Sequence, residues 1–394
     1  EGLKDIWKLR DPDLAKAMAD DVKLIAKKQM TVAEFKAKHA DHLDVLIDPD
    51  HPDLGPKNNQ FAFMGGRIQY GREAFMTRWL YGGFGSINFH NHCTVCGVAH
   101  RCAHGATSVK FDVAASAWDR SGIPCYFQPD FLNSEFVIFF GANPYEANYG
   151  PTPFSERLTE GLVSGRLKWA VVDPRMTRTA ARAWKWIPVK PGTDAALILG
   201  MMRWIVDNKR FDERFLRNAN QAAAKAAGEP GWCNASWLVK IDDEGPAALL
   251  RGDEIGQGDK STFVAVRDGQ PVPFKIYSGD AAEGDLFFDG TIGGYRVKTA
   301  FQILWEELQI HTVEEWAEIS DTKVEDLVTL ADEFTSHGKK AVAESHRGLL
   351  MSPAGFHNTR SVITLNMLIG NYHWKGGIIK GGKKDETGGQ EGQP

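Results

Sequence analysis

The spacing of hydrophobic and polar residues changes along the chain, and each spacing predicts a different kind of element. Residues 31–46 begin with a Thr-x-x-Glu capping box and continue with apolar residues at helical spacing, which predicts a solvent-facing helix. From residue 134, short continuous apolar runs alternate with helical segments, a pattern typical of strands buried on both faces. Residues 232–299 alternate apolar with polar positions around Asp-Gly and Gly-Gly pairs, which predicts β-hairpins. We therefore expect an α/β protein with a β-rich insert.

Three apolar runs are expected to lie in one parallel sheet. They are FVIFF (136–140), WAVVD (169–173) and AVAES (341–345), and none shows the polar alternation of a half-exposed strand. Because helical segments separate these runs, right-handed crossovers would place helices on both faces of a doubly wound, mostly parallel sheet. Sheets of this kind bind ligands beyond the carboxyl ends of their strands.

Composition and charge narrow the class of protein. The 394 residues are 43% hydrophobic and 25% charged, which is ordinary for a globular protein of about two domains. A net charge of −5 without a basic tract argues against a nucleic-acid-binding protein, whose affinity depends largely on neutralising phosphates. No apolar run approaches the about 20 residues that a membrane-spanning helix requires. The chain begins without methionine and ends in a polar, glycine-rich stretch, so we expect it to be part of a longer polypeptide.

Glycines and polar residues stand where the predicted strands end and where the next helix begins: Gly141, Asn143, Asp173, Gly192, Thr193 and Asp194. Glycine lets a ligand approach the backbone, asparagine offers a donor and an acceptor, and a carboxylate accepts hydrogen bonds from ribose hydroxyls. A helix start favours phosphate, and Asp194 could hold the edge of a guanine. The alternative is that these side chains merely cap helices and turns. Neither G-x-G-x-x-G nor a P-loop motif occurs, so the usual NAD and ATP sites are not expected.

The segment FGSINFHNHCTVCGVAHRCAHG (84–105) concentrates three of the five cysteines and four of the twelve histidines. An iron–sulfur cluster would need four thiolates, and only three are near. A second interpretation is a single thiolate on a soft metal that is held mainly by another cofactor. The third is a zinc site, which would draw three or four ligands from this segment: Cys93, Cys96, His100, Cys102 and His104. Residue counts leave the zinc site and the single-thiolate site open.

Several motifs follow one another in a fixed order: FGSINFHNHCTVC, FVIFFGANP, VVDPRMTRTA, WIPVKPGTDAALILGM, TVEEWAEISDTKVEDLVTLADEF and HRGLLMSPAGFHNTRSVITLNMLIGNYHWKGG. In this order they resemble the dimethyl-sulfoxide-reductase family of molybdopterin oxidoreductases. The segments GGRIQYGREAF and NYHWKGG most resemble the tetrathionate reductase branch of that family. The resemblance implies a molybdenum (or tungsten) bis(molybdopterin guanine dinucleotide) cofactor.

Carried over residue by residue, the resemblance assigns Cys96 as the thiolate on molybdenum, with His92 just before it. Cys93 and Cys102 are the other thiols that could serve. Arg67 and Arg347 would contact an anionic substrate, because guanidinium binds oxyanions through two parallel hydrogen bonds; the alternative is that they are solvated surface charges. The residues that would contact the guanine dinucleotide and the pterin are Gly141, Asn143, Asp173, Arg175, Gly192, Thr193, Asp194 and Asn358.

The implied activity is the reduction of a sulfur oxyanion, tetrathionate first, in anaerobic respiration. A soft metal with one protein thiolate and one open position suits oxygen-atom or sulfur-group transfer coupled to two electrons. Arsenate reductases and polysulfide or thiosulfate reductases of the same family are the alternatives. A different class of alternative is a non-catalytic fragment with a structural zinc knuckle at Cys93 and Cys96.

The resemblance also implies a domain division and a set of partners. Residues 1–90 would be the first part of a substrate-side α/β domain, and residues 91–345 the dinucleotide-binding domain with its insert at 232–299. Residues 346–394 would return to the first domain and end in a flexible tail. The four-cysteine motif for a [4Fe–4S] cluster is absent from this chain, so the cluster is expected in a missing amino-terminal part. The expected partners are a membrane anchor subunit with an iron–sulfur electron-transfer subunit, and the expected compartment is the periplasm.

Replacing single cysteines separates the two interpretations of the metal site. If Cys96 alone binds molybdenum, Cys96→Ser should abolish reductase activity in the complete enzyme and leave the fold intact, whereas Cys93→Ser should have a much milder effect. Activity assays and circular dichroism of both variants are the measurements. Equal unfolding of both variants, with a wild-type protein that a chelator unfolds, would favour a zinc knuckle, which needs at least three converging protein ligands.

Overall fold

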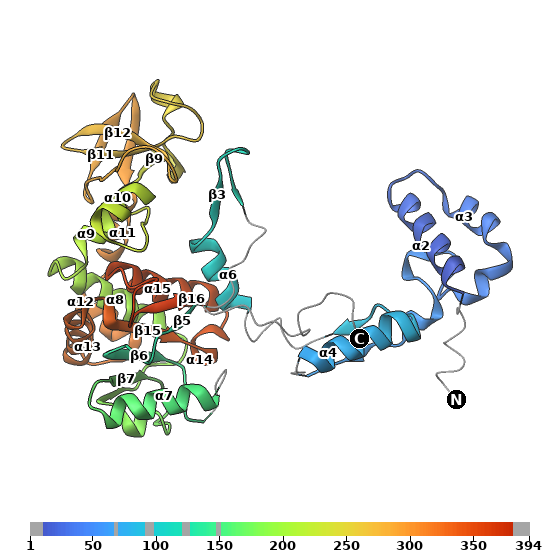
Figure 1. Ribbon diagram of the computed structural model, residues 1–394, viewed down its shortest axis with the longest axis horizontal. Helices are drawn as coiled ribbons and strands as arrows, with labels where there is room; N and C mark the ends of the chain where they lie inside the picture. The colour runs from blue at the N-terminus through green and yellow to red at the C-terminus, as the bar shows by residue number, and fades with distance from the viewer. Residues whose placement is uncertain (1–10, 67–69, 91–97, 120–126, 147–150, 381–394) are drawn as a thin grey trace. The chain divides into compact units, whose positions relative to one another are not determined.

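The computed structural model describes residues 11–66, 70–90, 98–119, 127–146 and 151–380 (Figure 1). The chain divides into two compact units, one of residues 1–95 with 383–394 and one of residues 96–382. The division lies at 95/96, close to the predicted boundary at 90/91. The predicted ligands Arg67, His92, Cys93 and Cys96 lie outside the described residues.

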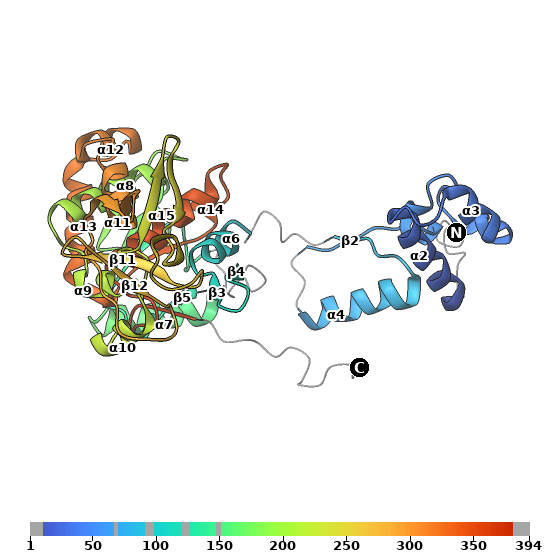
Figure 2. The same cartoon turned by 90° about the horizontal axis from the view of Figure 1, so that it is seen from above.

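The first unit is built from short helices and one pair of strands. Residues 31–46 form α3 (Val32–Lys38) and a 3₁₀ helix (Ala40–Val45), and the Thr31–Glu34 capping box is present. The helix α2 (Pro12–Ala26) packs beside α3 (Figure 2), and Met18, Phe35 and Leu46 form a small core. The other elements are 3₁₀ helices at Pro52–Leu54 and Lys57–Gln60, α4 (Tyr70–Arg78), a π-helix at Trp79–Phe84, and the parallel pair β1 (Phe63–Met64) and β2 (Phe89–His90).

The second unit contains the predicted parallel sheet. Its strands are β6 (Phe136–Phe140), β7 (Lys168–Val172), β8 (Lys185–Ile187) and β15 (Ala341–Ser345), in the order β15-β6-β7-β8. Every neighbouring pair is parallel, and Phe140 of β6 lies opposite Val172 on one side and Ser345 on the other. This confirms that the three apolar runs share one parallel sheet.

The two faces of the sheet bury alternate residues of each strand. Phe136, Ile138 and Phe140 belong to one core cluster, whereas Val137 and Phe139 belong to the other. The first face packs against α8 (Asp194–Asp207) and α13 (Val324–Ser336), and the second against α7 (Pro151–Val163) and α6 (Val98–Thr107) (Figure 1). The helix α15 (Gly355–Leu368) contributes to both clusters. Helices therefore cover both faces, as predicted for a doubly wound sheet.

The insert at 232–299 consists of antiparallel hairpins, as predicted. They are β9 (Leu238–Asp242) with β10 (Gly245–Leu249), β11 (Phe263–Arg267) with β12 (Gln270–Phe274), and β13 (Asp289–Ile292) with β14 (Tyr295–Thr299). The remaining elements of this unit are β3 (Lys110–Asp112), β4 (Ala117–Asp119), β5 (Phe127–Pro129), α9 (Glu213–Arg217), α10 (Gln221–Ala227), α11 (Ala300–Leu308), α12 (Val313–Ser320), α14 (Arg347–Leu350), β16 (Ile378–Lys380) and 3₁₀ helices at Ala180–Arg182, Asp253–Ile255 and Gly338–Lys340.

The predicted return of residues 346–394 to the first domain is not what the structure shows for residues 346–380. Here α15 packs against α6, α8 and β15, and β16 pairs with β5 of the same unit. The cause is hydrophobic, because Leu365 and Leu368 are fully buried in the core cluster of the sheet. Among the described residues, no helix has the length and apolar character that a membrane span requires.

Candidate functional site

The strand order creates one position where neighbouring connections diverge. The chain leaves β6 towards β7 and then β8 on one side, while β15, the last strand in sequence, lies on the other side of β6. In open parallel sheets, ligands bind beyond the carboxyl ends of the strands at such a switch point. We call the residues that follow the four strands, 141–146, 173–179, 188–194 and 346–352, the carboxyl edge.

Two glycines meet at the switch point. Gly348 N–H donates to the Gly141 carbonyl at 2.9 Å, which joins the segment after β15 to the segment after β6. Gly141 has φ +55°, and a Cβ there would lie 2.6 Å from the Leu349 nitrogen and 2.8 Å from Gly348. A Cβ on Gly348 would lie 2.7 Å from the Gly141 Cα. Because the obstructing atoms are backbone, no side chain can move aside, and both positions require glycine.

Asn143 is held in place by a network that local sequence patterns do not reveal. The buried Thr179 hydroxyl donates to Asn143 Oδ1 at 2.5 Å, and the Trp169 indole donates to the Thr179 carbonyl at 3.0 Å. The Asn143 amide donates to the Glu146 carboxylate, which also forms an ion pair with Arg178 at 3.3 Å. Thr179 is therefore a positioning residue for Asn143. The signal that could have found it is the VVDPRMTRTA motif that contains it.

Asp173 serves a turn and also lies at the carboxyl edge. Its Oδ1 accepts the Arg175 N–H at 2.9 Å, which is the capping role weighed as the alternative to ribose binding. The Trp186 indole donates to the Asp173 carbonyl at 2.8 Å and fixes the backbone at the end of β7. The Asp173 side chain is only 8% exposed, whereas Arg175 is exposed. The turn bond uses one carboxylate oxygen, and Oδ2 is the one that a ligand hydroxyl could reach.

Gly192, Thr193 and Asp194 form a tight turn into α8. Gly192 has φ +86°, and Thr193 N–H and Oγ1 both donate to the Lys190 carbonyl, at 3.1 Å and 2.7 Å. Thr193 therefore occupies the N-cap position without capping α8 through its side chain. This leaves the first turn of α8, with Asp194 as its first residue, to other partners such as a ligand.

The two predicted carboxylates interact with each other. Burial, and after it the negative charge of Asp173, raise the pKa of the Asp194 carboxyl above its ordinary value of 3.8. Asp194 is 7% exposed, and no cation pairs with it among the described residues. Two neighbouring carboxylates without a cation favour a ligand that donates hydrogen bonds, such as ribose hydroxyls or the N–H edge of a guanine. Asp173 and Asp194 thus lie at the same edge, as predicted.

Asn358 and Arg347 lie at the end of β15. Asn358 is 1% exposed, and its amide donates to the Leu349 carbonyl at 3.2 Å and to the Ser352 hydroxyl at 3.1 Å. Its observed role is therefore to hold the turn after α14, and direct contact with a pterin stays a prediction. Arg347 begins α14 immediately beyond the strand, at the carboxyl edge, where its contact with an anion also stays a prediction.

The described part of the cysteine- and histidine-rich segment contains no group of three metal-ligating side chains. His100 and His104 approach each other on α6, with 3.2 Å between their Nε2 atoms. Burial, with a smaller contribution from His100, lowers the pKa of His104 to about 3, so this imidazole is neutral at physiological pH. Cys102 carries a free thiol on the same helix.

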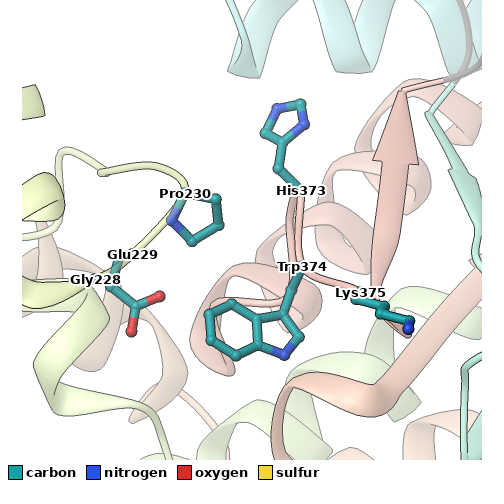
Figure 3. Close-up of a pocket in the computed structure, with 6 residues that line it drawn as sticks. All are labelled: Gly228, Glu229, Pro230, His373, Trp374 and Lys375. Carbon is teal, nitrogen blue, oxygen red and sulfur yellow. The ribbon is translucent and has the colours of Figure 1, made fainter.

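A shallow pocket of about 390 Å³ lies away from the predicted residues (Figure 3). Its Glu229 carboxylate pairs with Lys339 at 2.5 Å, and Trp374 stands on the facing loop (Figure 3). The lining residues are Gly228, Glu229, Pro230, His373, Trp374 and Lys375, none of which belongs to the carboxyl edge. The candidate site therefore rests on the switch point and its side chains, not on this pocket.

Comparison with known proteins identifies relatives of the chain. The family model described as "Molybdopterin oxidoreductase" matches residues 51–386. A selenate reductase subunit of Mesobacillus selenatarsenatis is 49% identical over 397 aligned residues, which cover 100% of this chain and 38% of that protein. The corresponding tetrathionate reductase subunit is 33% identical in Archaeoglobus fulgidus (91% of this chain, 31% of the relative) and 34% identical in Salmonella typhimurium (89% and 34%). The chain thus spans about a third of the length of these relatives.

Asp194→Asn tests the electrostatics of the edge in protein free of bound ligands. A raised carboxyl pKa contributes stability that is complete below 3.8 and is lost as pH rises through the raised value. Asparagine keeps the shape and does not titrate, so the variant should gain stability relative to wild type as pH rises from acid to neutral. Urea unfolding across this pH range is the measurement.

The matched control is Asp326→Asn, in the first turn of α13, where Lys185 lies 2.6 Å from the carboxylate. This variant should show no gain at neutral pH. A constant stability difference between Asp194→Asn and wild type at every pH would contradict the raised pKa.

Proposed function

This chain belongs to the molybdopterin oxidoreductase family of the dimethyl sulfoxide reductase type, and we propose that it is part of the catalytic subunit of a molybdenum enzyme that reduces an oxyanion of selenium or sulfur. The observation that carries the proposal is the 49% identity to part of a selenate reductase over 100% of the chain. The carboxyl edge supports it, since it offers buried carboxylates and close-packed glycines where the family motifs lie.

The substrate that we propose first is selenate. Tetrathionate is the substrate expected from the sequence motifs, but the identity to the tetrathionate reductases is 33–34%, below the 49% to the selenate reductase. Tetrathionate remains the second candidate. The two substrates require different bond cleavage, because selenate loses an oxygen atom as water whereas tetrathionate is cleaved between two sulfur atoms.

The cofactor form that we propose is a molybdenum or tungsten bis(molybdopterin guanine dinucleotide). The side chains present fit this group, because Asp194 is a buried carboxylate that lacks a cation among the described residues and would accept the N–H groups of a guanine edge. Asp173 would accept ribose hydroxyls through Oδ2, and Gly141 and Gly192 would let phosphate groups approach the backbone. Asn143, fixed by Thr179, would add a donor and an acceptor beside Gly141.

When bound, the metal supplies a two-electron reductant with an open position for the oxyanion. The residues of this chain would bind and orient. We propose Cys96 as the thiolate ligand, and Arg347 as a bidentate contact that orients the anion at the end of β15. His92 and Arg67 are proposed to lie near the same centre.

We further propose that the complete catalytic polypeptide carries a [4Fe–4S] cluster and receives electrons from an iron–sulfur subunit. A periplasmic location and a membrane anchor subunit complete this proposal. The support is the resemblance of the motifs to the respiratory branch of the family, together with relatives that are about three times as long as this chain.

Assays of the complete enzyme with a reduced viologen dye test the function. We expect molybdenum (or tungsten) and guanine nucleotide in comparable amounts, and a higher kcat/KM with selenate than with tetrathionate. Removal of the charged acceptor in Asp194→Ala should cost about 1.5–3 kcal/mol of cofactor binding and lower the metal and nucleotide content. Asp326→Ala, which removes an ion-paired carboxylate that is not part of the carboxyl edge, is the control and should retain both. Stoichiometric zinc without pterin would contradict the proposal, and full retention in Asp194→Ala would contradict the guanine contact.

A further inference from the structure

One face of the parallel sheet carries polar groups inside an apolar cluster. Glu344 is the fourth residue of β15, lies opposite Phe139 of β6, and shares a face with Val342. Tyr372, which follows α15, is 9% exposed, and its hydroxyl has no hydrogen-bond partner among the described residues. His104 of α6 is 5% exposed, and its Nδ1 likewise has none within the described part of the chain. Buried polar atoms of this kind usually bind water or a ligand.

These groups are close together. The Phe127 ring lies between two of them, with its centroid 5.1 Å from the His104 ring and 5.4 Å from the Tyr372 ring. Glu344 interacts electrostatically with Tyr372 and helps to raise the pKa of that phenol above its ordinary value. The three polar side chains thus belong to one region of the sheet face, which we call the inner polar cluster (Glu344, Tyr372 and His104).

The Glu344 carboxyl is surrounded by protein and has no ion-pair partner among the described residues. Burial raises its pKa to about 8, whereas an ordinary glutamate has 4.5. His346, Arg347 and His100 take part in interactions of their own, and Glu135 pairs with Lys340 at 2.8 Å. The titratable side chains on or beside the elements around β15 are His100 and His104 of α6, Asp130, Glu135, Glu333, His337, Lys339, Lys340, His346, Arg347, His357, Arg360 and Tyr372. Tyr372 is the member of this set whose charge state the structure couples to Glu344.

The position of Glu344 connects the inner polar cluster to the candidate site. Only Ser345 separates it from the carboxyl edge, where Arg347 begins α14 and Gly348 meets Gly141. Part of the Glu344 residue is accessible to solvent, which permits exchange of its proton. An acid group at this place would be one strand end away from a bound oxyanion.

We propose that Glu344 is a neutral carboxylic acid that stores a proton for oxyanion reduction and is reprotonated through water bound between Tyr372 and His104. This inference rests on the proposed function. Loss of one oxygen from selenate breaks a selenium–oxygen bond and consumes two electrons, supplied by the reduced metal–pterin group, and two protons. The oxygen leaves as water. Glu344 provides one of these protons and becomes a carboxylate, which then takes up a proton from solvent, and the second proton comes from solvent by the same route.

Infrared spectroscopy of the complete enzyme tests the protonation state independently of turnover. Wild type should show a carbonyl stretching band of a protonated carboxylic acid at neutral pH, and this band should disappear as pH rises through about 8. Glu344→Gln should lack the band. The control is Glu333→Gln, because ion pairs with Lys168 and His337 keep the pKa of Glu333 below its ordinary value and leave it ionised. A spectrum in which Glu344→Gln removes no such band would overturn the proposal.

The pH profile of turnover tests the role in the reaction. Glu344→Gln should lower kcat by on the order of 10²-fold, the typical contribution of a positioned proton donor, with a much smaller change in KM. Wild-type kcat should fall as pH rises through about 8, and this dependence should vanish in Glu344→Gln. Tyr372→Phe, which removes only a hydroxyl, should lower kcat and raise the solvent isotope effect, and it supplies the test if Glu344→Gln does not fold.

The two readouts separate failure of this inference from failure of the proposed function. An enzyme that shows the protonated band but has the same pH profile of kcat in Glu344→Gln as in wild type contradicts the proton-store role and leaves the reductase function standing. An enzyme that reduces neither selenate nor tetrathionate contradicts the proposed function and, with it, the role of Glu344 in the reaction.

Discussion

The close approach of two backbone segments at the carboxyl ends of β6 and β15 is the constraint on which the candidate site depends. Gly141 and Gly348 touch without side chains, and a Cβ on either would lie within 2.8 Å of backbone atoms of the other. This contact lets β15 pair in parallel with β6 while the two following segments diverge. The divergence turns the centre of the sheet into a switch point, the position where such folds bind ligands.

Around this contact, the structure separates the groups that hold the backbone from the groups that can bind a ligand. Thr179, Trp169 and Trp186 use their polar atoms within the protein, and thereby fix Asn143 and Asp173. Asp194 instead stays buried without a cation among the described residues, which raises its pKa and disfavours its charged form until donors arrive. A ligand with N–H and hydroxyl donors would relieve this cost, so the edge is arranged for a nucleotide before one binds.

The sequence predicts the central strands well and the tertiary contacts poorly, for a physical reason. A strand buried on both faces must be apolar at nearly every position, so β6, β7 and β15 are visible as apolar runs. By contrast, β5 and β16 have three residues each and are far apart along the chain, and the packing of α15 depends on which core accepts it. Asp173 and Asp194 are found because they follow predicted elements, whereas Thr179 acquires its role from Asn143, 36 residues away. The single hint of Glu344 is an acid inside an otherwise apolar run.

The most direct test of this account is the molybdenum and guanine-nucleotide content of the folded complete enzyme with Gly141→Ala. Gly165→Ala is the matched control, because Gly165 also has positive φ, +72°, but a Cβ there would meet no atom within 4 Å. Gly141→Ala should lose most of both cofactor components per folded molecule, since the segments after β6 and β15 must move apart, and Gly165→Ala should retain them. A folded Gly141→Ala enzyme with the molybdenum and nucleotide content of the control would contradict the claim that this contact shapes the cofactor site.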